Sequence, residues 1–372
     1  MPRTKDYEKY LWGCRFCPMC KPASDTANVT FLECHSARAH AMIIWRASNG
    51  IKEYTDKDIE LLYKTNLDGV SEAFCVDHYP VTSYMLAARQ DIVEAGREPQ
   101  VVKNVFDRFG REQRIETKNV KKGGAVVLCS EALSFGYDKA TERVGALAEK
   151  TGAGVIAGYG GVDHYVLGNT QKAVDEASAL VKAIADSQAK TVIADGSETW
   201  FALTKLYPEL GVKLPEGVKV VNMNDFAFDG KDISKTAITG KNVFVHDARA
   251  SYFLRDENTD EKVIMPDFFG PEELLGTGRV FDAPREIVDK MGAKRLFSVW
   301  SRAMARAMGM DDALYLTYPE LAVKIAAKRI KEIAGLNAEY IVTDSFATVM
   351  FLESAKPEGV ETIKTVWLPE LI

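Results

Sequence analysis

The sequence predicts an α+β multidomain protein, with a helical N-terminal domain followed by two similar α/β domains that contain parallel sheets. The chain has 372 residues, which is too many for one ordinary hydrophobic core. All six cysteines lie within the first 129 residues, and short apolar runs alternate with helical segments only in the part that follows. This alternation is typical of parallel sheets covered by helices. We place the domains at 1–118, 119–240 and 241–372.

The first 118 residues have mostly helical composition with little β-branched patterning. Apolar residues recur at helical spacing in the segments 36–45 and 83–95, which predicts a helix in each. A basic, polar stretch runs from Arg108 to Lys122 and ends in Gly123–Gly124. This composition predicts a linker between the first and second domains.

The rest of the chain contains an internal repeat. The passage Thr191–Asp195 aligns without gaps with Tyr340–Asp344, after which Thr199 faces Thr348. Two copies of one α/β unit explain this match. The alternative is a chance similarity between two stretches in which strands and helices alternate. Strands are predicted at 125–128, 154–157, 191–194, 242–247 and 340–343, and helices at 139–150, 171–187, from 199, 284–291, 300–310 and 319–334.

The composition excludes several classes of protein. Apolar residues make up 47% and charged residues 27% of the chain, which is an ordinary globular mixture and not a disordered one. The net charge of −6, without a block of Lys or Arg, argues against binding to nucleic acid. No apolar run reaches the roughly 18–20 residues of a membrane span, and no signal peptide begins the chain. We therefore expect a cytoplasmic protein.

Three cysteines share one short loop. Cys14, Cys17 and Cys20 have the spacing C-x2-C-x2-C, which presents three thiols to one small object. A [4Fe–4S] cluster requires this, because each iron takes one thiolate. Structural zinc more often uses two separated C-x2-C pairs, and the sequence has no second pair. The crowding of the cysteines at one end of a long chain also argues against a disulfide framework. We expect one cluster, with zinc or plain buried thiols as the alternatives.

The fourth ligand of this cluster is predicted to be Cys75, with Cys34 as the runner-up. In bacterial runs of the form C-x2-C-x2-C-x3-C-P, the last cysteine serves the other cluster of a pair. Two such runs, the second ending at Cys75, would bind two clusters. In this chain the four ligands of one cluster are all present, as Cys14, Cys17, Cys20 and Cys75. The four positions that would bind the other cluster all carry residues other than cysteine. For Cys34 and Cys129 the alternative is a small buried hydrophobic residue. The missing ligands correspond to Ser24, Thr65, Asp68 and Ser71.

With these cysteines, the chain resembles the iron–sulfur subunits that include the glycolate oxidase iron–sulfur subunit, the lactate-utilisation iron–sulfur protein and the heterodisulfide reductase cysteine-rich subunit. That family joins an α-helical ferredoxin domain to two α/β domains named for a CCG motif. The resemblance covers nearly the whole chain. The segments that carry it are Ser36–Ala39, Cys75 with the following Leu86 and Arg89, Gly158–His164, Val245–Arg249 and Phe281–Glu286.

The chain departs from this family in the CCG-like domains. Tyr159 and Gly160 replace the two cysteines of the first CCG motif, and Arg249 replaces the cysteine of a His-Asp-Pro-Cys motif. Ser345 and Thr348 stand where a further pair would fall, and the second CCG motif would lie near 299–300, again without sulfur. Oxygen and carbon side chains do not replace thiolates at an iron–sulfur site. We therefore expect no cluster and no heterodisulfide chemistry in these domains.

Several titratable residues are further candidates. His35 and His78 flank the cysteine segments, where an imidazole can hydrogen-bond to cluster sulfur, although surface imidazoles are the alternative. A residual pocket is predicted near the strand ends, where α/β sheets bind ligands. Hydrogen-bonded remnants are the alternative for its histidines. The candidate residues of this pocket are Asp163, His164, His246 and Asp247.

The resemblance implies an electron-transfer subunit of an oxidoreductase complex. Its one [4Fe–4S] cluster would pass electrons between a flavin-type partner and another carrier, in the oxidation of a 2-hydroxy acid such as glycolate or lactate or in a heterodisulfide-reductase-like complex. Any association with a membrane would be made through a partner. No nucleophile–base–acid motif predicts catalysis by this chain alone. The alternative is a non-redox interaction protein with a structural cluster or zinc.

Overall fold

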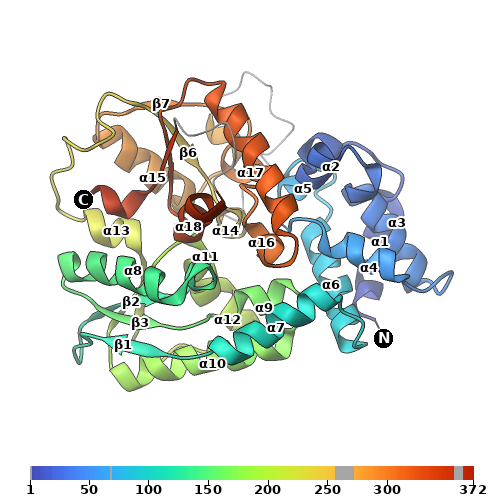
Figure 1. Cartoon of the computed structure of the whole chain (residues 1–372), viewed down its shortest axis with the longest axis horizontal. Coiled ribbons are helices and arrows are strands. Elements are labelled where there is room, and N and C mark those ends of the chain that lie inside the picture. The colour runs from blue at the N-terminus through green and yellow to red at the C-terminus, as the bar shows by residue number, and fades with distance from the viewer. Residues whose placement is uncertain (1, 68, 256–271, 356–362) are drawn as a thin grey trace.

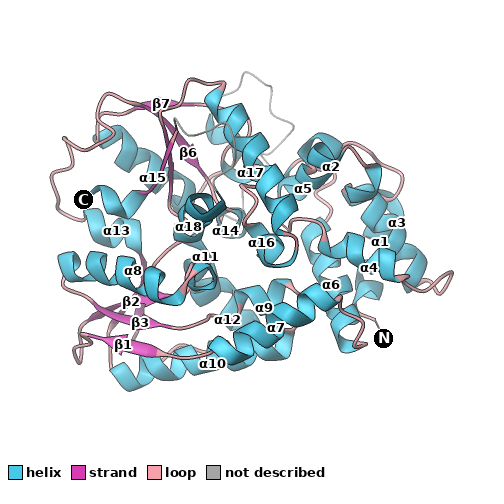
Figure 2. Ribbon diagram, in the orientation of Figure 1, coloured by secondary structure: helices cyan, strands magenta, loops and turns pink. Residues whose placement is uncertain are grey.

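The computed structural model describes residues 2–67, 69–255, 272–355 and 363–372. It contains an N-terminal helical region at one end of the molecule and two sheets flanked by helices (Figures 1 and 2). The expected combination of a helical N-terminal region with two α/β sheets is therefore confirmed. None of the described helices combines the length and apolar character that crossing a membrane would require.

The N-terminal region starts its helices with side-chain caps at two places. The Ser36 side chain accepts a hydrogen bond from the backbone N–H of Ala39, and Thr55 and Asp58 cap each other's backbone groups reciprocally. Such caps satisfy N–H groups that have no partner inside the helix. Helices α3 and α6 are those predicted at 36–45 and 83–95. The helices are α1 Glu8–Cys14, α2 Asp25–Thr30, α3 Ala37–Ser48, α4 Asp56–Tyr63, α5 Val70–Ala73, α6 Val81–Glu94 and α7 Gln100–Glu112.

The predicted linker at 108–122 is wrong. Helix α7 continues to Glu112, and β1 (Glu116–Lys118) pairs antiparallel with β3 (Gly154–Ala157), with Glu116 opposite Ala157. All three residues of β1 are exposed, so the sequence has no apolar alternation there that would distinguish a strand from a loop. The helical region thus ends at Glu112, before the boundary placed at 118.

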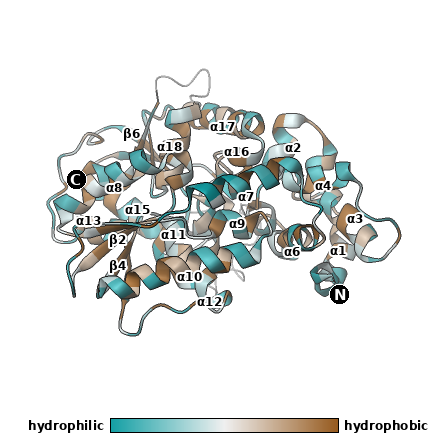
Figure 3. Cartoon of the chain, turned by 60° about the horizontal axis from the view of Figure 1, so that its bottom comes forward, coloured by the Kyte–Doolittle hydropathy of each residue, from teal (hydrophilic) through white to brown (hydrophobic). Residues whose placement is uncertain are grey.

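The first sheet has the strand order β1-β3-β2-β4-β5, and every pair except β1–β3 is parallel. Its central strands are apolar along their whole length because helices cover both faces; α8 and α10 lie on opposite sides (Figures 1 and 3). The further strands are β2 Ala125–Cys129, β4 Thr191–Ala194 and β5 Lys219–Asn222. The helices are α8 Tyr137–Thr151, α9 Val162–Val166, α10 Thr170–Ser187, α11 Ser197–Phe201, a π-helical turn Ala202–Leu206, α12 Tyr207–Glu209 and α13 Met223–Phe228.

The second sheet is wholly parallel and has the order β7-β6-β8-β9. This is the order β3-β2-β4-β5 of the first sheet, so β8 occupies the place of β4, as the alignment of Tyr340–Asp344 with Thr191–Asp195 requires. The strands are β6 Asn242–His246, β7 Lys294–Leu296, β8 Tyr340–Thr343 and β9 Lys364–Trp367. The helices are α14 Arg249–Phe253, α15 Arg279–Lys290, α16 Leu314–Thr317, α17 Pro319–Ala334 and α18 Phe346–Ala355.

The helix predicted at 300–310 is absent from the described structure of that segment, which contains only the 3₁₀ turn Arg302–Met304. Arg302 and Gly309 have positive φ angles of 56° and 92°, which end a right-handed helix. A side chain at Gly309 would also place its Cβ 2.2 Å from the backbone oxygen of Ala322. The apolar spacing in this segment therefore reflects a buried loop, in which Met304, Met308 and Met310 join the core.

Two buried arginines fix the helical region against the α/β units. Arg89 of α6 donates to the backbone oxygen of Val166, at the end of α9, with a distance of 2.7 Å. Arg306 of the second α/β unit pairs with Asp25 of α2 at 2.8 Å, and both side chains are buried. Because the helical region is tied to both units in this way, the three parts pack as one body.

Candidate metal centre

The loop that carries three of the cysteines begins at the end of α1, whose last residue is Cys14. Backbone hydrogen bonds fold this loop into successive turns: Cys17 N–H donates to the oxygen of Cys14 at 3.0 Å, and Lys21 N–H to that of Pro18 at 3.1 Å. Cys14 and Cys20 are buried, whereas Cys17 is exposed. The turns keep the three thiols within one compact segment that has a buried side and an exposed side.

Cys75 lies beside this loop although it is distant in sequence. Burial raises the pKa of Cys14 to about 11, and the nearby thiols of Cys75 and Cys17 add to this effect. Burial likewise raises the pKa of Cys20 to about 12, with further contributions from Cys14, Cys75 and Cys17. Thiols influence one another in this way only at short range. The thiols of Cys14, Cys17, Cys20 and Cys75, the four predicted ligands, therefore lie within electrostatic range of one another, without being arranged around a single metal position in the described structure.

The turn after α5 positions Cys75. Its N–H donates to the backbone oxygen of Glu72 at 3.1 Å, and its own oxygen accepts from His78 N–H at 3.1 Å. The Cys75 Sγ accepts a hydrogen bond from the N–H of Tyr79 at 3.5 Å. These backbone contacts hold the Cys75 side chain in place within the turn.

Two tyrosines pack against the cysteine loop. The Tyr84 hydroxyl of α6 lies 3.2 Å from the Cys14 Sγ, and the tyrosine is fully buried. The Tyr79 ring packs directly on Gly13, where a Cβ would stand 2.5 Å from the tyrosine hydroxyl oxygen. Only glycine fits this position without displacing the ring. A hydroxyl group beside a ligating sulfur is the kind of contact that tunes a metal site.

The other two cysteines lie apart from these four. Cys34 is half-buried in the 3₁₀ turn Glu33–His35, and among the described thiols those that act on the pKa of Cys14 are Cys75 and Cys17, not Cys34. Cys129 ends strand β2 in the first α/β unit, and its burial raises its pKa well above the usual value. Cys129 occupies a core position suited to a small hydrophobic residue.

The two histidines near the cysteines differ in their surroundings. His35 is buried; burial lowers its pKa, and the charge of Lys64 lowers it further. His78 is exposed and has a positive φ of 48°. Within the described ranges, neither imidazole makes a hydrogen bond to a cysteine sulfur. The same part of the chain holds no group of three or more His, Cys, Asp or Glu side chains arranged around a single metal ion.

The residues predicted to form a residual pocket are divided between the two sheets. Asp163 and His164 lie in α9. The His164 Nδ1 is 3.0 Å from a carboxylate oxygen of Glu176, and its ring stacks on Phe106 with 5.2 Å between centroids. His164 is therefore held by packing and one hydrogen bond.

The second predicted pair lies at the end of β6. Burial opposes ionisation of Asp247, but its two contacts to Arg285, at 2.7 and 2.8 Å, outweigh this effect and lower the pKa of Asp247. Burial, with the charge of Arg329, lowers the pKa of His246 to about 3. Neither His246 nitrogen has a hydrogen-bond partner among the described residues. Neither His246 nor Asp247 lines the cavity that Asp163 faces.

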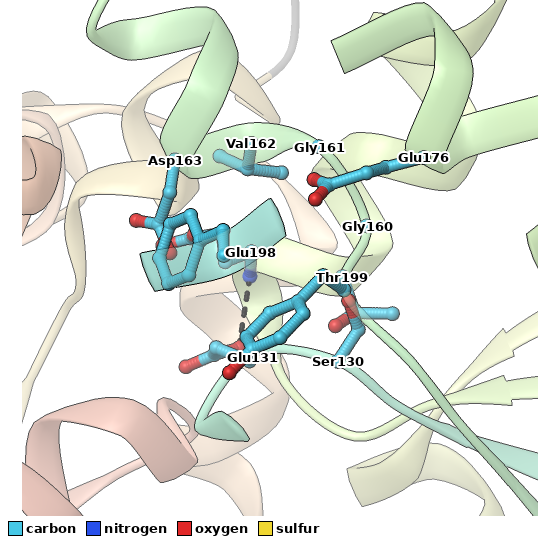
Figure 4. Close-up of a pocket in the computed structure, with 11 residues that line it drawn as sticks. Ser130, Glu131, Gly160, Gly161, Val162, Asp163, Glu176, Glu198 and Thr199 are labelled. Carbon is cyan, nitrogen blue, oxygen red and sulfur yellow. Dashed lines mark hydrogen bonds between the residues drawn. The ribbon is translucent and has the colours of Figure 1, made fainter. Parts of the chain in front are cut away.

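That cavity lies beyond the carboxyl ends of β2, β3 and β4 and has a volume of about 10 Å³, room for roughly one water molecule. Its lining is rich in carboxyl groups from different elements (Figure 4). Burial raises the pKa of Asp163 in this lining to about 7. The lining residues include Asp163, Glu131, Glu176 and Glu198 with the hydroxyl groups of Ser130, Tyr159 and Thr199.

Glu131 links the two α/β units and was missed by the sequence analysis. Its carboxylate accepts from the N–H of Glu198 at 3.1 Å in the first unit, and from the Ser345 hydroxyl and the Ala347 N–H in the second. Burial raises its pKa to about 8, and the charge of Asp195 adds to this. No sequence pattern identifies Glu131, because two of its three hydrogen-bond partners, Ser345 and Ala347, come from a unit that is distant in sequence.

Asp195 and Asp344 are two further buried carboxyl groups at this junction. Burial raises the pKa of Asp195 to about 6 and that of Asp344 to about 7. Each residue directly follows a strand, β4 or β8, and the two were aligned in the internal repeat. The repeat was therefore a signal that could have identified them.

Tyr159 and Arg249 have structural roles. The Tyr159 hydroxyl donates to Glu112 at 2.9 Å. The buried Arg249 donates to the backbone oxygen of Leu67 at 2.9 Å and pairs with Asp312 at 2.6 Å, which ties the helical region to the second α/β unit. These side chains make packing and polar contacts and supply no metal ligand of the thiolate type.

Comparison with known proteins shows a likeness of fold. No family model matches the sequence, and no curated protein matches it. The crystal structure of a hypothetical protein from Helicobacter pylori is similar, with a TM-score of 0.59 and 8% sequence identity over 90% of this chain and 66% of that chain. The chain thus spans less than two thirds of the length of that protein. At this identity the similarity supports the fold, a mostly helical α/β architecture with two sheets.

Proposed function

We propose that this protein transfers electrons through one [4Fe–4S] cluster held by Cys14, Cys17, Cys20 and Cys75. One observation carries the proposal: thiols from two distant segments gather at a single place, while Cys129 lies in the core of a sheet. Four thiols match the four irons of such a cluster, each of which takes one terminal ligand.

The surroundings of the four thiols fit this group. Cys14 and Cys20 are buried among apolar residues of the helical region, and Tyr84 brings a hydroxyl to the sulfur of Cys14. Cys17 is exposed. When bound, the cluster supplies one-electron redox chemistry. The chain's own residues orient the sulfurs, exclude water from two of them and leave one side open to another protein.

The partner follows from the resemblance to iron–sulfur subunits. We infer a complex in which a flavin-bearing subunit exchanges electrons with this chain and another carrier completes the path, with a 2-hydroxy acid such as glycolate or lactate as the substrate of the complex. The two α/β units then serve as a platform for the other subunits. The absence of cysteine at Tyr159, Gly160, Arg249, Ser345 and Thr348 supports a single cluster per chain.

Anaerobic purification followed by iron and sulfide assays tests this function. We expect about four iron and four sulfide per chain, broad visible absorption that dithionite bleaches, and an EPR signal after reduction. A colourless protein with one zinc per chain would instead establish the structural alternative. Iron at twice the expected level would show that a second centre exists.

A further inference from the structure

Large apolar side chains are exposed beside the proposed cluster ligands. Trp12, Phe16, Met19 and Val76 each lie within two positions of one of the four cysteines, and Phe16 is 63% exposed. Trp12 contacts Phe16 with 5.8 Å between ring centroids. Exposed apolar side chains concentrated in this way mark a surface that another molecule covers. We call these four residues, together with Arg15, the aromatic patch.

Arg15 is the cation of the aromatic patch. Its guanidinium carbon lies 3.7 Å from the Trp12 ring centroid, 4.2 Å from that of Phe16 and 3.9 Å from that of Trp45. Its Nε has no hydrogen-bond partner, and no carboxylate of the described chain lies within ion-pair distance of it. The rings thus hold a permanent positive charge in a fixed place, without a counter-ion among the residues that the structure describes.

We propose that the aromatic patch is the docking surface for a second redox protein, whose contact face offers apolar side chains and a carboxylate that pairs with Arg15. Tryptophan, phenylalanine, methionine and arginine are the residues enriched in the centres of protein interfaces. The unpaired guanidinium is complementary to a carboxylate in charge and in geometry, because it can donate two parallel hydrogen bonds.

The location of the aromatic patch favours a redox protein as the occupant, and in this respect the inference rests on the proposed function. Cys17, next to Phe16, is the exposed member of the four thiols. Electron transfer slows steeply with distance, so a partner must approach the side on which a ligating sulfur is accessible. A protein seated on Phe16 and Met19 covers that side.

Photo-crosslinking in the native host tests the aromatic patch. The full chain is produced with p-benzoylphenylalanine in place of Phe16 and, as a matched control, in place of Phe297, another exposed phenylalanine that lies just after β7. Crosslinked proteins are identified by mass spectrometry and assayed for flavin, haem and iron. We expect a cofactor-bearing protein at the Phe16 site, with about tenfold or greater yield over the Phe297 site.

Charge reversal tests the role of Arg15. In the chain labelled at Phe16, Arg15→Glu is expected to lower the crosslink yield about tenfold, while Arg111→Glu, at an exposed arginine of α7, leaves the yield unchanged. Because Arg15 lies in the cysteine loop, iron content is measured for each variant. If Arg15→Glu loses iron, Val76→Asp, which places a carboxylate in the same patch, replaces it and is expected to lower the yield as well.

Several results would overturn the docking proposal. These are equal yields at the Phe16 and Phe297 sites, a crosslink to a second copy of this chain, a captured protein without a redox cofactor, or a yield insensitive to the charge changes. The iron assay of the unaltered chain judges the proposed function separately. If the chain contains no iron but still crosslinks to a redox protein at the Phe16 site, the proposed cluster is contradicted and the proposed docking surface is supported.

Discussion

At the scale of the residue, substitution of Cys75 distinguishes the proposed cluster from its alternatives. Cys75→Ser replaces a soft thiolate with a hydroxyl, so we expect loss of most of the iron from anaerobically prepared protein. Cys129→Ser, at a thiol buried in β2, and Cys34→Ser are expected to keep the iron. Iron and sulfide assays with visible absorption measure the effect. Loss of iron in Cys34→Ser alone, or equal loss in all three variants, would contradict the assignment.

Gly13 gives a second prediction at this scale. An added Cβ would stand 2.5 Å from the Tyr79 hydroxyl oxygen, so Gly13→Ala is expected to lower the free energy of unfolding by about 1–3 kcal/mol through overpacking. The control is Gly110→Ala in α7, where a Cβ would contact nothing within 4 Å. That change is expected to be neutral or stabilising by about 0.5–1 kcal/mol. Chemical denaturation measures both; equal effects would show that the Tyr79 ring moves freely.

At the scale of the element, the carboxyl groups at the facing sheet edges predict a pH dependence. Burial raises the pKa of Glu131 to about 8 and that of Asp344 to about 7, above their usual values near 4. The folded state therefore binds these protons more tightly than the unfolded state, and their contribution to stability is lost as the pH rises through the folded-state values.

We therefore expect the free energy of unfolding, measured by chemical denaturation, to fall between about pH 5 and pH 8. Asp344→Asn, which cannot ionise, should flatten this dependence. Asp175→Asn, a substitution on the exposed surface of α10, should not flatten it. A stability that rises over this interval would show that these carboxyl groups are ionised in the folded protein.

Strands could be predicted from the sequence where burial is complete on both faces. β2, β3, β4, β6 and β8 are central, and each contains a run of at least three consecutive apolar residues, which predicts a buried strand. β1, β5, β7 and β9 flank them and were missed: each begins with an exposed Glu or Lys, and the pattern is correspondingly weak. The proximity of Cys14, Cys17 and Cys20 follows from their local spacing, whereas the binding of a cluster by the four cysteines stays a prediction. The contacts of Glu131 could not, because they depend on how two distant units face each other.

At the scale of the whole molecule, the junction between the helical region and the α/β units depends on buried charge. Asp25 accepts from the Arg306 guanidinium and from the Ala307 N–H, each at 2.8 Å. Asp25→Ala leaves the buried Arg306 with Glu332 as its remaining ion-pair partner and is expected to lower the free energy of unfolding by about 1–3 kcal/mol. Asp175→Ala, which removes an exposed carboxylate, should change it by less than about 0.5 kcal/mol. Similar values for the two variants would show that the junction contributes little to stability.

Gly160 limits which side chains the lining of the small cavity can accept. A Cβ at this position would lie 2.5 Å from the Ser130 hydroxyl oxygen and 3.2 Å from that of Tyr207. The backbone at this position approaches Ser130 closely because glycine carries no Cβ. A larger side chain at this position therefore forces Ser130 to move.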